Sequence, residues 1–259
     1  MTRKPDSHSQ SMLKIANKCL REYKLNFIDN IKPERVDSSA LQFGTACHTA
    51  MQAILEGGNG LEVFSLYWAS VKEKPLQYYK FNWEALKNIG EVLLTRFERL
   101  HAKNFKIAHP MEVRLYGDIN GQKVEGTPDF IGEYKGIPSL VDFKTAKAPY
   151  SKHSIEISEQ LHLYAYLAKQ CLNYEVEQIV YVVLSKNPIR IQVLEKKLAE
   201  TNHNDIILNI GTQLEELSAR IKFPQNLNSC LAGNYKCSYW EYCHGNERRR
   251  DSGDTGKGK

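Results

Sequence analysis

The sequence predicts a mixed α/β protein in which helices flank a central mixed sheet. Apolar residues recur every three or four positions through about the first hundred residues, which is the period of helices. Met111, Val113 and Leu115 then alternate with polar residues, which is the period of a strand. After one further helix, the continuous apolar run from Ile179 to Leu184 predicts a buried strand.

The expected elements follow from these periods and from the residues that interrupt them. Gly57-Gly58 ends the second helix, and Pro75 separates the third helix from the fourth. Gly117 to Gly121 predicts a hairpin turn. The expected helices cover residues 10–29, 39–56, 60–74, 83–104, 155–171 and 199–220. The expected strands cover residues 111–116, 122–133, 140–144, 179–184 and 189–194.

The composition is that of a globular protein, and the length allows one large domain or two small ones. Of the 259 residues, 42% are hydrophobic and 25% are charged, which excludes a disordered chain, a collagen and a coiled-coil rod. We expect one domain over residues 1–245 and a disordered basic tail over 246–259. The longest apolar run has six residues, far below the ~20 of a membrane helix. The first ten residues carry no apolar signal sequence, so we expect a cytoplasmic protein.

The net charge gives no functional assignment by itself. Thirty-five basic residues against 30 acidic ones leave +5, which is compatible with a polyanionic partner without requiring one.

Two short acidic segments carry the first indication of chemistry. Pro128-Asp129 is followed, after twelve intervening residues, by Asp142-Phe143-Lys144 in a predicted strand. Residues two apart in a strand face the same side, so Asp142 and Lys144 project together. Two carboxylates suit Mg²⁺ or Mn²⁺, and a neighbouring lysine can act on a water molecule and a phosphate. The alternative is a charged pair on the surface of a strand edge.

Four segments in this order resemble the PD-(D/E)XK nuclease superfamily, specifically its RecB-like branch. They are the opening helix from Ser9 to Cys19, Phe43-Gly44-Thr45-Ala46-Cys47-His48, Gly126 to Lys144, and Gln160-Leu161-His162-Leu163-Tyr164. The resemblance covers about residues 9–243. It implies a restriction-endonuclease-like core with a helical N-terminal layer and a cysteine-containing C-terminal segment.

The resemblance also implies roles for individual residues. His48, Asp129, Asp142 and the main-chain carbonyl of Phe143 would hold the metal ion. Lys144 would act on the attacking water and on the scissile phosphate. The alternative for His48 is a histidine that is buried in the core or caps a helix.

Two more matched residues, Gln160 and Tyr164, lie one helical turn apart and face the same way. The resemblance implies that they contact the nucleic-acid backbone or the surroundings of Lys144. Ordinary helix packing is the alternative for Tyr164, and exposure to solvent for Gln160. Glu112 is either a further acid of the site or a solvent-facing strand residue.

The cysteines are concentrated near the C-terminal end. Cys230, Cys237 and Cys243 fall within 14 residues, which in a reducing compartment indicates metal ligation sooner than disulfides. Together with Cys19 they resemble the [4Fe-4S] arrangement of part of the family, although six residues separate Cys230 from Cys237 where two are usual. Structural zinc and three unligated thiols are the alternatives. Cys47 and Cys171 are interpreted as small buried residues.

These observations predict a metal-dependent DNA nuclease, more specifically an exonuclease, in recombination, repair or phage DNA metabolism. The substrate would be single- or double-stranded DNA, and a phage-encoded protein would act in the host cytoplasm. The alternative is a weak or inactive nuclease-fold accessory protein that binds nucleic acid and carries a structural metal site made of four cysteines. No G-x-x-x-x-G-K-[ST] motif occurs, so a helicase would have to be a separate partner.

Overall fold

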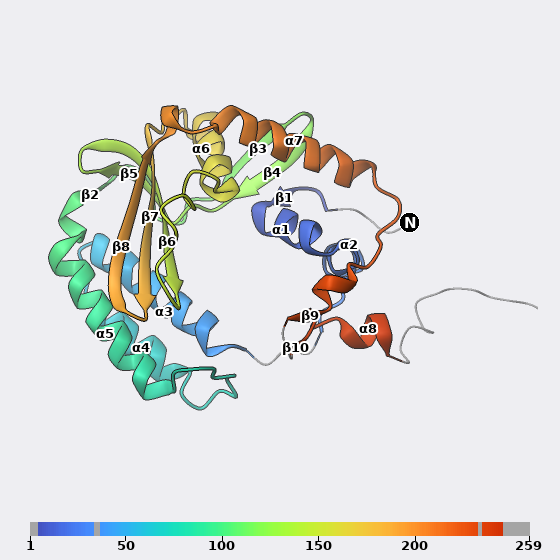
Figure 1. The fold of residues 1–259 in the computed structure, drawn as a ribbon. Coiled ribbons are helices and arrows are strands. Elements are labelled where there is room, and N and C mark those ends of the chain that lie inside the picture. The colour runs from blue at the N-terminus through green and yellow to red at the C-terminus, as the bar shows by residue number, and fades with distance from the viewer. Residues whose placement is uncertain (1–4, 34–36, 233–234, 246–259) are drawn as a thin grey trace, which may run out of the picture. The chain divides into compact units, whose positions relative to one another are not determined.

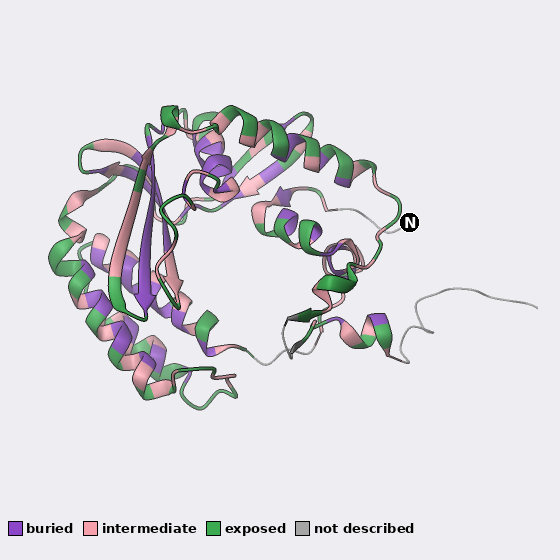
Figure 2. Cartoon of the chain, viewed as in Figure 1, coloured by how far each residue is buried: buried purple, intermediate pink, exposed green. Residues whose placement is uncertain are grey.

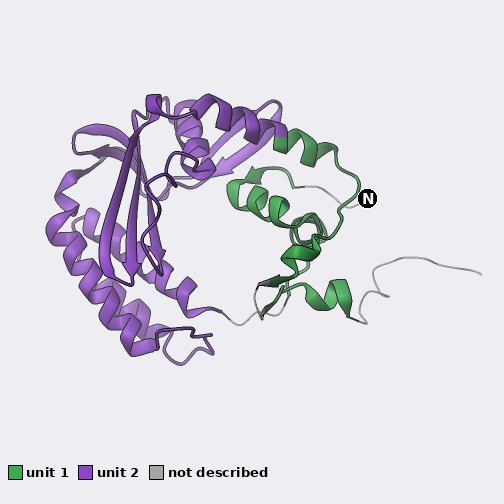
Figure 3. Cartoon of the chain, viewed as in Figure 1, with its two compact units in different colours: residues 1–35, 213–259 green, residues 36–212 purple. Residues whose placement is uncertain are grey.

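The computed structural model describes residues 5–33, 37–232 and 235–245 (Figure 1). The chain divides into two compact units (Figure 3). Unit 1 combines residues 1–35 with 213–259, and unit 2 spans residues 36–212. The predicted tail over 246–259 lies outside the described residues. No helix in the described ranges is long and apolar enough to cross a membrane.

Unit 2 is built on a five-stranded mixed sheet, as the sequence predicts. The strand order is β2-β5-β6-β7-β8. Only the central pair, β6 and β7, is parallel; the other three pairings are antiparallel. The strands are β2 Phe105–Ile107, β5 Phe130–Tyr134, β6 Ile137–Ala146, β7 Gln178–Lys186 and β8 Ile189–Lys197. A separate antiparallel hairpin joins β3 Leu115–Ile119 to β4 Gln122–Gly126.

Helices cover both faces of this sheet (Figure 1). Helices α3 Ser39–Leu55, α4 Gly60–Ser70 and α5 Trp83–Leu100 lie on one face, and α6 Glu159–Leu172 lies on the other. Strand β7 is therefore buried along its whole length (Figure 2). A strand buried on both faces reads as one apolar run, which is why residues 179–184 predict it.

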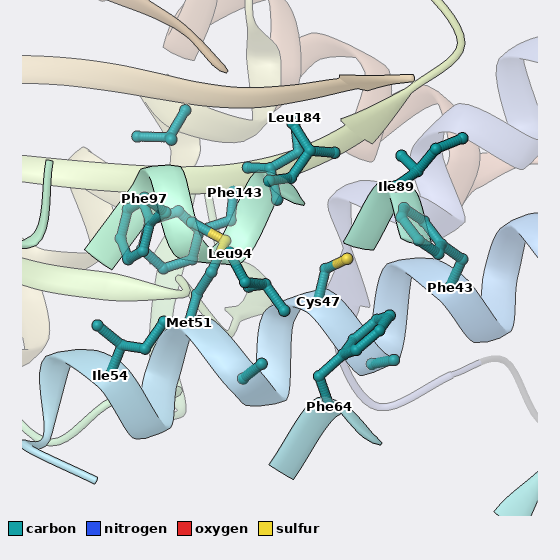
Figure 4. Packing of buried hydrophobic residues seen from close by; sticks show 14 of the residues in the cluster. Phe43, Cys47, Met51, Ile54, Phe64, Ile89, Leu94, Phe97, Phe143 and Leu184 are labelled. Carbon is teal, nitrogen blue, oxygen red and sulfur yellow. The ribbon is translucent and has the colours of Figure 1, made fainter. Parts of the chain in front are cut away.

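The main hydrophobic core lies between the sheet and α3, α4 and α5 (Figure 4). Phe143 of β6 and Leu184 of β7 pack there against Met51 of α3 and Phe97 of α5. Because side chains alternate along a strand, Asp142 and Lys144 project from the opposite face of β6. The core therefore fixes the strand that carries the predicted acid and lysine.

Unit 1 is made of short elements. They are β1 His8–Ser9, α1 Gln10–Lys18, α2 Leu20–Tyr23, a π-helical turn over Lys24–Ile28, β9 Leu231–Ala232, β10 Tyr235–Lys236 and α8 Trp240–His244. Helix α7, His203–Ala219, begins in unit 2 and ends in unit 1.

The single helix expected over 10–29 is wrong, because the chain breaks it at Cys19. Cys19 has extended backbone angles, φ −160° and ψ 112°. Two side chains of the C-terminal segment donate to the Lys18 carbonyl at the end of the interrupted helix. They are Asn226 Nδ2 at 2.8 Å and Ser229 Oγ at 3.0 Å. Hydrogen bonds from a distant segment replace local helical ones, and helical periodicity cannot reveal that.

Three strand predictions also need correction. The segment 122–133 forms two strands, β4 and β5, because Pro128 between them has no N–H to donate to a ladder. The strand expected from 111 begins only at Leu115, since Glu112 adopts a left-handed backbone with φ 53°. The hairpin turn is confined to Asn120-Gly121. Strand β2 was not predicted.

Candidate active site

The acid and lysine of β6 form a close ion pair on a central strand. Asp142 Oδ2 lies 2.6 Å from Lys144 Nζ. The Asp142 side chain is only 2% exposed, whereas that of Lys144 is 26% exposed. The pair therefore joins a buried carboxylate to a cation that reaches solvent.

Asp129 meets this strand from the neighbouring one. It directly precedes β5, which pairs antiparallel with β6. The Phe143 backbone N–H donates to Asp129 Oδ2 at 2.6 Å, which fixes the carboxylate beside β6. Gly126, at the end of β4 just before this segment, allows close packing against Tyr164 of α6. A Cβ atom at position 126 would lie only 2.3 Å from the Tyr164 ring.

His48 reaches the same site from α3. Its Nδ1 lies 3.5 Å from Asp129 Oδ1, and its ring meets the Phe143 ring edge to face at 6.2 Å. One turn earlier, Gly44 lets α3 pack closely against β6: a Cβ there would lie 3.2 Å from Thr145 Oγ1. The predicted G-x-x-x-H spacing thus positions a glycine at the helix–sheet contact and a histidine at the acids.

Gln160 and Tyr164 on α6 complete a hydrogen-bonded chain. Lys144 Nζ donates to Gln160 Oε1 at 2.8 Å, and Gln160 Nε2 lies 3.2 Å from the Tyr164 hydroxyl. Ser158 caps the first turn of α6. The structure therefore brings together all six of the predicted side chains: His48, Asp129, Asp142, Lys144, Gln160 and Tyr164.

Sequence reasoning missed Tyr181. Its ring centroid lies 5.9 Å from Lys144 Nζ, and its hydroxyl lies 2.5 Å from Ser158 Oγ. Tyr181 thus joins β7 to Ser158 at the start of α6, and its ring packs against the Lys144 ammonium. A tyrosine inside the otherwise aliphatic run of 179–184 was the available signal, since a buried hydroxyl needs a partner.

Burial and mutual repulsion shape the charges of the site. Burial and the Asp129 carboxylate raise the pKa of Asp142 to about 7, although the Lys144 ammonium opposes them. Burial by itself would lower the pKa of Lys144, but Asp142 outweighs it and the pKa is raised. Burial would likewise lower the pKa of His48, but the hydrogen bond and charge of Asp129 outweigh burial, and the pKa is raised.

These donors fit a hard divalent cation. Asp142 Oδ2 is buried, and no donor in the described part of the chain is aligned to give it a hydrogen bond, in spite of the nearby lysine. Two carboxylates that face one another without a cation repel, and a divalent ion relieves the repulsion. The described residues contain no preformed group of three or more His, Cys, Asp or Glu side chains able to hold an ion.

Glu112 is exposed and lies in the turn before β3. Of its two interpretations, solvent exposure agrees with the structure, although in a turn and not in a strand. Its backbone N–H approaches the Asp129 carbonyl at 3.5 Å.

A second cluster of reactive side chains lies within unit 1. Cys19, Cys230, Cys237 and Cys243 all line one small pocket, together with the aromatic residues Tyr239 and Trp240. Cys19 is turned toward it by the helix break described above, and its Sγ accepts a hydrogen bond from the Asn226 N–H at 3.4 Å.

A short hairpin explains how the long gap between Cys230 and Cys237 is closed. Strands β9 and β10 pair antiparallel, with Lys236 opposite Leu231. The Cys237 N–H donates to the Cys230 carbonyl at 2.8 Å, so the two cysteines flank the base of the hairpin. The hairpin thus keeps Cys230 and Cys237 next to each other, although six residues separate them in the sequence.

The other two cysteines differ from each other. Cys47 is fully buried in the core beneath the sheet, as expected (Figure 4). Cys171 was also expected to be buried, but it is exposed on α6. None of the six cysteines forms a disulfide.

The fold and this arrangement of acids and lysine define a nuclease-like hydrolase core. The profile of the PD-(D/E)XK nuclease superfamily matches residues 7–244, and the chain therefore belongs to that superfamily. No curated protein matches the chain.

Solved structures with a similar fold are remote in sequence. The crystal structure of a protein named "Putative exonuclease" from Eubacterium rectale aligns with 93% of this chain and 94% of that one, at 14% identity and a TM-score of 0.56. The crystal structure of SSO0001 aligns with 83% of this chain and 87% of that one, at 16% identity and a TM-score of only 0.32.

Proposed function

We propose that this protein is a Mg²⁺- or Mn²⁺-dependent deoxyribonuclease of the RecB-like branch that degrades DNA from its ends. The observation that carries the proposal is the buried Asp142 carboxylate, opposed by Asp129 and paired with Lys144 on a central strand. Burying a carboxylate costs folding free energy, so its place on a central strand indicates a functional reason to keep it there. Exonuclease action is supported by the description of the Eubacterium rectale protein and by the resemblance of the motifs.

In this proposal each residue has one task. Asp129, Asp142 and the Phe143 carbonyl hold the cation, with His48 as a further ligand. When bound, the cation supplies positive charge to the scissile phosphate and acidifies a water molecule. Lys144 orients the attacking water and stabilises charge that develops on the phosphate oxygens. Gln160 holds Lys144 in place, and Tyr164 holds Gln160.

The test is incubation with end-labelled single- and double-stranded DNA in Mg²⁺, Mn²⁺ or chelator. We expect progressive shortening from the ends with either cation and none with chelator. A closed circular substrate separates exonuclease from endonuclease action, because it has no end. DNA binding without cleavage under every metal condition would contradict the proposal and favour the inactive accessory protein.

We also propose that the four cysteines of unit 1 bind one metal centre, a [4Fe-4S] cluster in preference to zinc. Four thiols on one pocket, with aromatic rings beside them, match the donor set of either centre. Ligation in the folded state alone would stabilise unit 1 by joining its N-terminal and C-terminal segments.

Metal analysis of anaerobically purified protein tests this proposal. We expect a brown protein with absorbance near ~400 nm and about four irons per chain. A colourless protein with one zinc would overturn the iron–sulfur assignment, and a protein without metal would leave plain thiols. The biological setting, in recombination, repair or phage DNA metabolism with a separate helicase, rests on the RecB-like resemblance.

A further inference from the structure

A pocket in unit 2 lies at the ends of β6 and β7 and contains none of the proposed catalytic residues. Its volume is about 410 Å³. It is lined by Tyr79, Lys80 and Phe81 from the loop between α4 and α5, by Lys147 just after β6, and by Lys186 at the end of β7. These segments are far apart in the sequence, and the fold brings them together.

The charge of this pocket is entirely positive. Three lysines line it, and no aspartate or glutamate does. Within the described ranges, no carboxylate lies within ion-pair distance of Lys80, Lys147 or Lys186. Elsewhere in unit 2, lysines such as Lys106 and Lys135 do have acidic partners. The pocket therefore suits an anion.

Lys186 is the least expected member of the set. It is only 9% exposed, and its Nζ lies 5.0 Å above the Phe43 ring. Burial lowers the pKa of this lysine, which means that the surroundings disfavour its charge. A buried cation without a carboxylate destabilises the fold, so a bound anion would offset a cost that the free protein bears.

The aromatic side chains add an apolar surface to the charge. Tyr79 is 60% exposed, and Phe81 is half-buried in the same loop. Lysines interleaved with accessible rings are the pattern by which proteins hold single-stranded nucleic acid, since each unpaired base can stack on a ring while a cation contacts the phosphate. A duplex cannot stack in this way, because its bases are already stacked on one another.

The pocket lies next to the candidate active site. Ala40 of α3 lines it, and His48 of the same helix lies at Asp129. Eight helical residues separate the two, or about 12 Å along the axis. Lys147, just after the end of β6, follows Lys144 of that strand by three residues, or about 10 Å. A strand whose phosphate lies at Asp142 would have a nucleotide within a few positions of this pocket.

We propose that this pocket binds a nucleotide of single-stranded DNA next to the bond that is cut, with a base against Tyr79 and Phe81 and a phosphate at Lys147 and Lys186. The inference rests on the proposed nuclease function for its substrate. It extends that function by making an unpaired strand, and not duplex DNA, the form that the protein holds.

Binding in chelator tests the pocket without cleavage. Fluorescence anisotropy of a labelled oligothymidylate gives the affinity, and Tyr79→Ala should weaken it about tenfold. Lys147→Gln should weaken it about threefold and reduce the slope of log affinity against log salt by about 0.7. The matched controls, Tyr116→Ala and Lys103→Gln, alter an equally exposed tyrosine and an exposed lysine outside the pocket, and should stay within twofold.

Lys186→Met gives a second, independent readout. It keeps the buried stem but removes the charge, so the melting temperature should rise or stay equal while affinity for the oligonucleotide falls severalfold. Binding of blunt duplex should change less than twofold in Tyr79→Ala.

The outcomes separate this proposal from the nuclease proposal. Wild-type binding of single strands that both Tyr79→Ala and Lys147→Gln weaken supports the pocket, even if no metal produces cleavage. Cleavage with variants that bind like their controls overturns the pocket and leaves the nuclease proposal standing. A wild-type protein that does not bind single strands, or binds an RNA oligonucleotide tenfold more tightly than DNA, overturns it as well.

Discussion

The two clusters of reactive side chains in this protein are built in opposite ways. In unit 2, Asp142 and Lys144 stand on β6, the central strand of the sheet, next to the fully buried β7, and a large core fixes β6. In unit 1, the four cysteines are joined by a nine-residue helix, two-residue strands and a five-residue helix. The buried cluster around them consists of Leu25, Tyr239 and Cys243.

This difference indicates which site depends on its ligand for structure. A site on a packed sheet is positioned before any ion binds, so loss of the ion should remove activity and leave the fold. A site formed by short segments has little packing to hold it, so its ligand contributes to the folding free energy directly. The predictions below test this contrast, from the largest expected effect to the smallest.

Asp142→Asn should reduce DNA cleavage by on the order of 10³-fold, because it removes a proposed ligand and the partner of Lys144. In chelator, its melting temperature should equal or exceed that of wild type, since one of two facing carboxylates has lost its charge. Cleavage assays and thermal unfolding measure the two effects. Asp205→Asn, an exposed control, should alter neither. An unfolded Asp142→Asn variant would show that this site, too, holds its fold together.

Cys237→Ser should lower the melting temperature by about 5–10 °C, because it removes one ligand of the proposed metal centre. Cys171→Ser is the matched control, since that thiol is exposed on α6. Cys47→Ser is a poorer control, because it would bury a hydroxyl in the core. Equal melting temperatures for Cys237→Ser and Cys171→Ser would mean that the cysteines hold no structural metal.

Acid should destabilise unit 2 because of two neighbouring histidines, His162 on α6 and His203 at the start of α7. His162 Nδ1 lies 3.0 Å from His203 Nδ1. Burial, with His203 adding to it, lowers the pKa of His162 from 6.5 to about 4. Below pH 6.5 the unfolded chain therefore binds a proton that the folded protein does not. The stability that this difference provides is complete above pH 6.5 and is lost as the pH falls to about 4, by about 3 kcal/mol at most.

Urea unfolding at pH 7 and pH 4 measures this loss. His162→Gln does not titrate and should show a smaller decrease between the two pH values than wild type. The exposed control His153→Gln should follow wild type. If His162→Gln and wild type lose the same free energy of unfolding, the pair does not govern acid sensitivity.

Gln160→Ala should lower kcat about tenfold with little change in KM, because Gln160 orients Lys144 and is not proposed to touch the metal. Gln52→Ala, a half-buried glutamine on α3 outside the site, is the control. A change confined to KM would instead assign Gln160 to substrate binding. Steady-state cleavage of labelled DNA distinguishes the two.

The sequence is most informative where local pattern and global packing agree. Helix α3 begins at Ser39 as expected and ends at Leu55, one residue before the predicted end, and the β7–β8 pair follows directly from its apolar run. Motif order also anticipated which side chains meet, although Asp129 and Asp142 come from different strands. Their proposed roles are still predictions.

What the sequence could not predict depends on contacts between distant segments. The break at Cys19 is held by Asn226 and Ser229, some two hundred residues away. The division between β4 and β5 had a local signal in Pro128, whereas β2 is too short to show a period. The lysine and aromatic pocket combines four separate segments, so no single window of sequence contains it.

The central claim is that Asp129 and Asp142 hold a catalytic divalent cation and that Lys144 acts beside it on DNA. Calorimetric titration with Mn²⁺, run beside cleavage assays on the same samples, tests it most directly. We predict that wild type binds Mn²⁺ and cleaves, that Lys144→Ala binds Mn²⁺ but does not cleave, and that Asp142→Asn does neither. Mn²⁺ binding and cleavage by Asp142→Asn at wild-type levels would contradict the account.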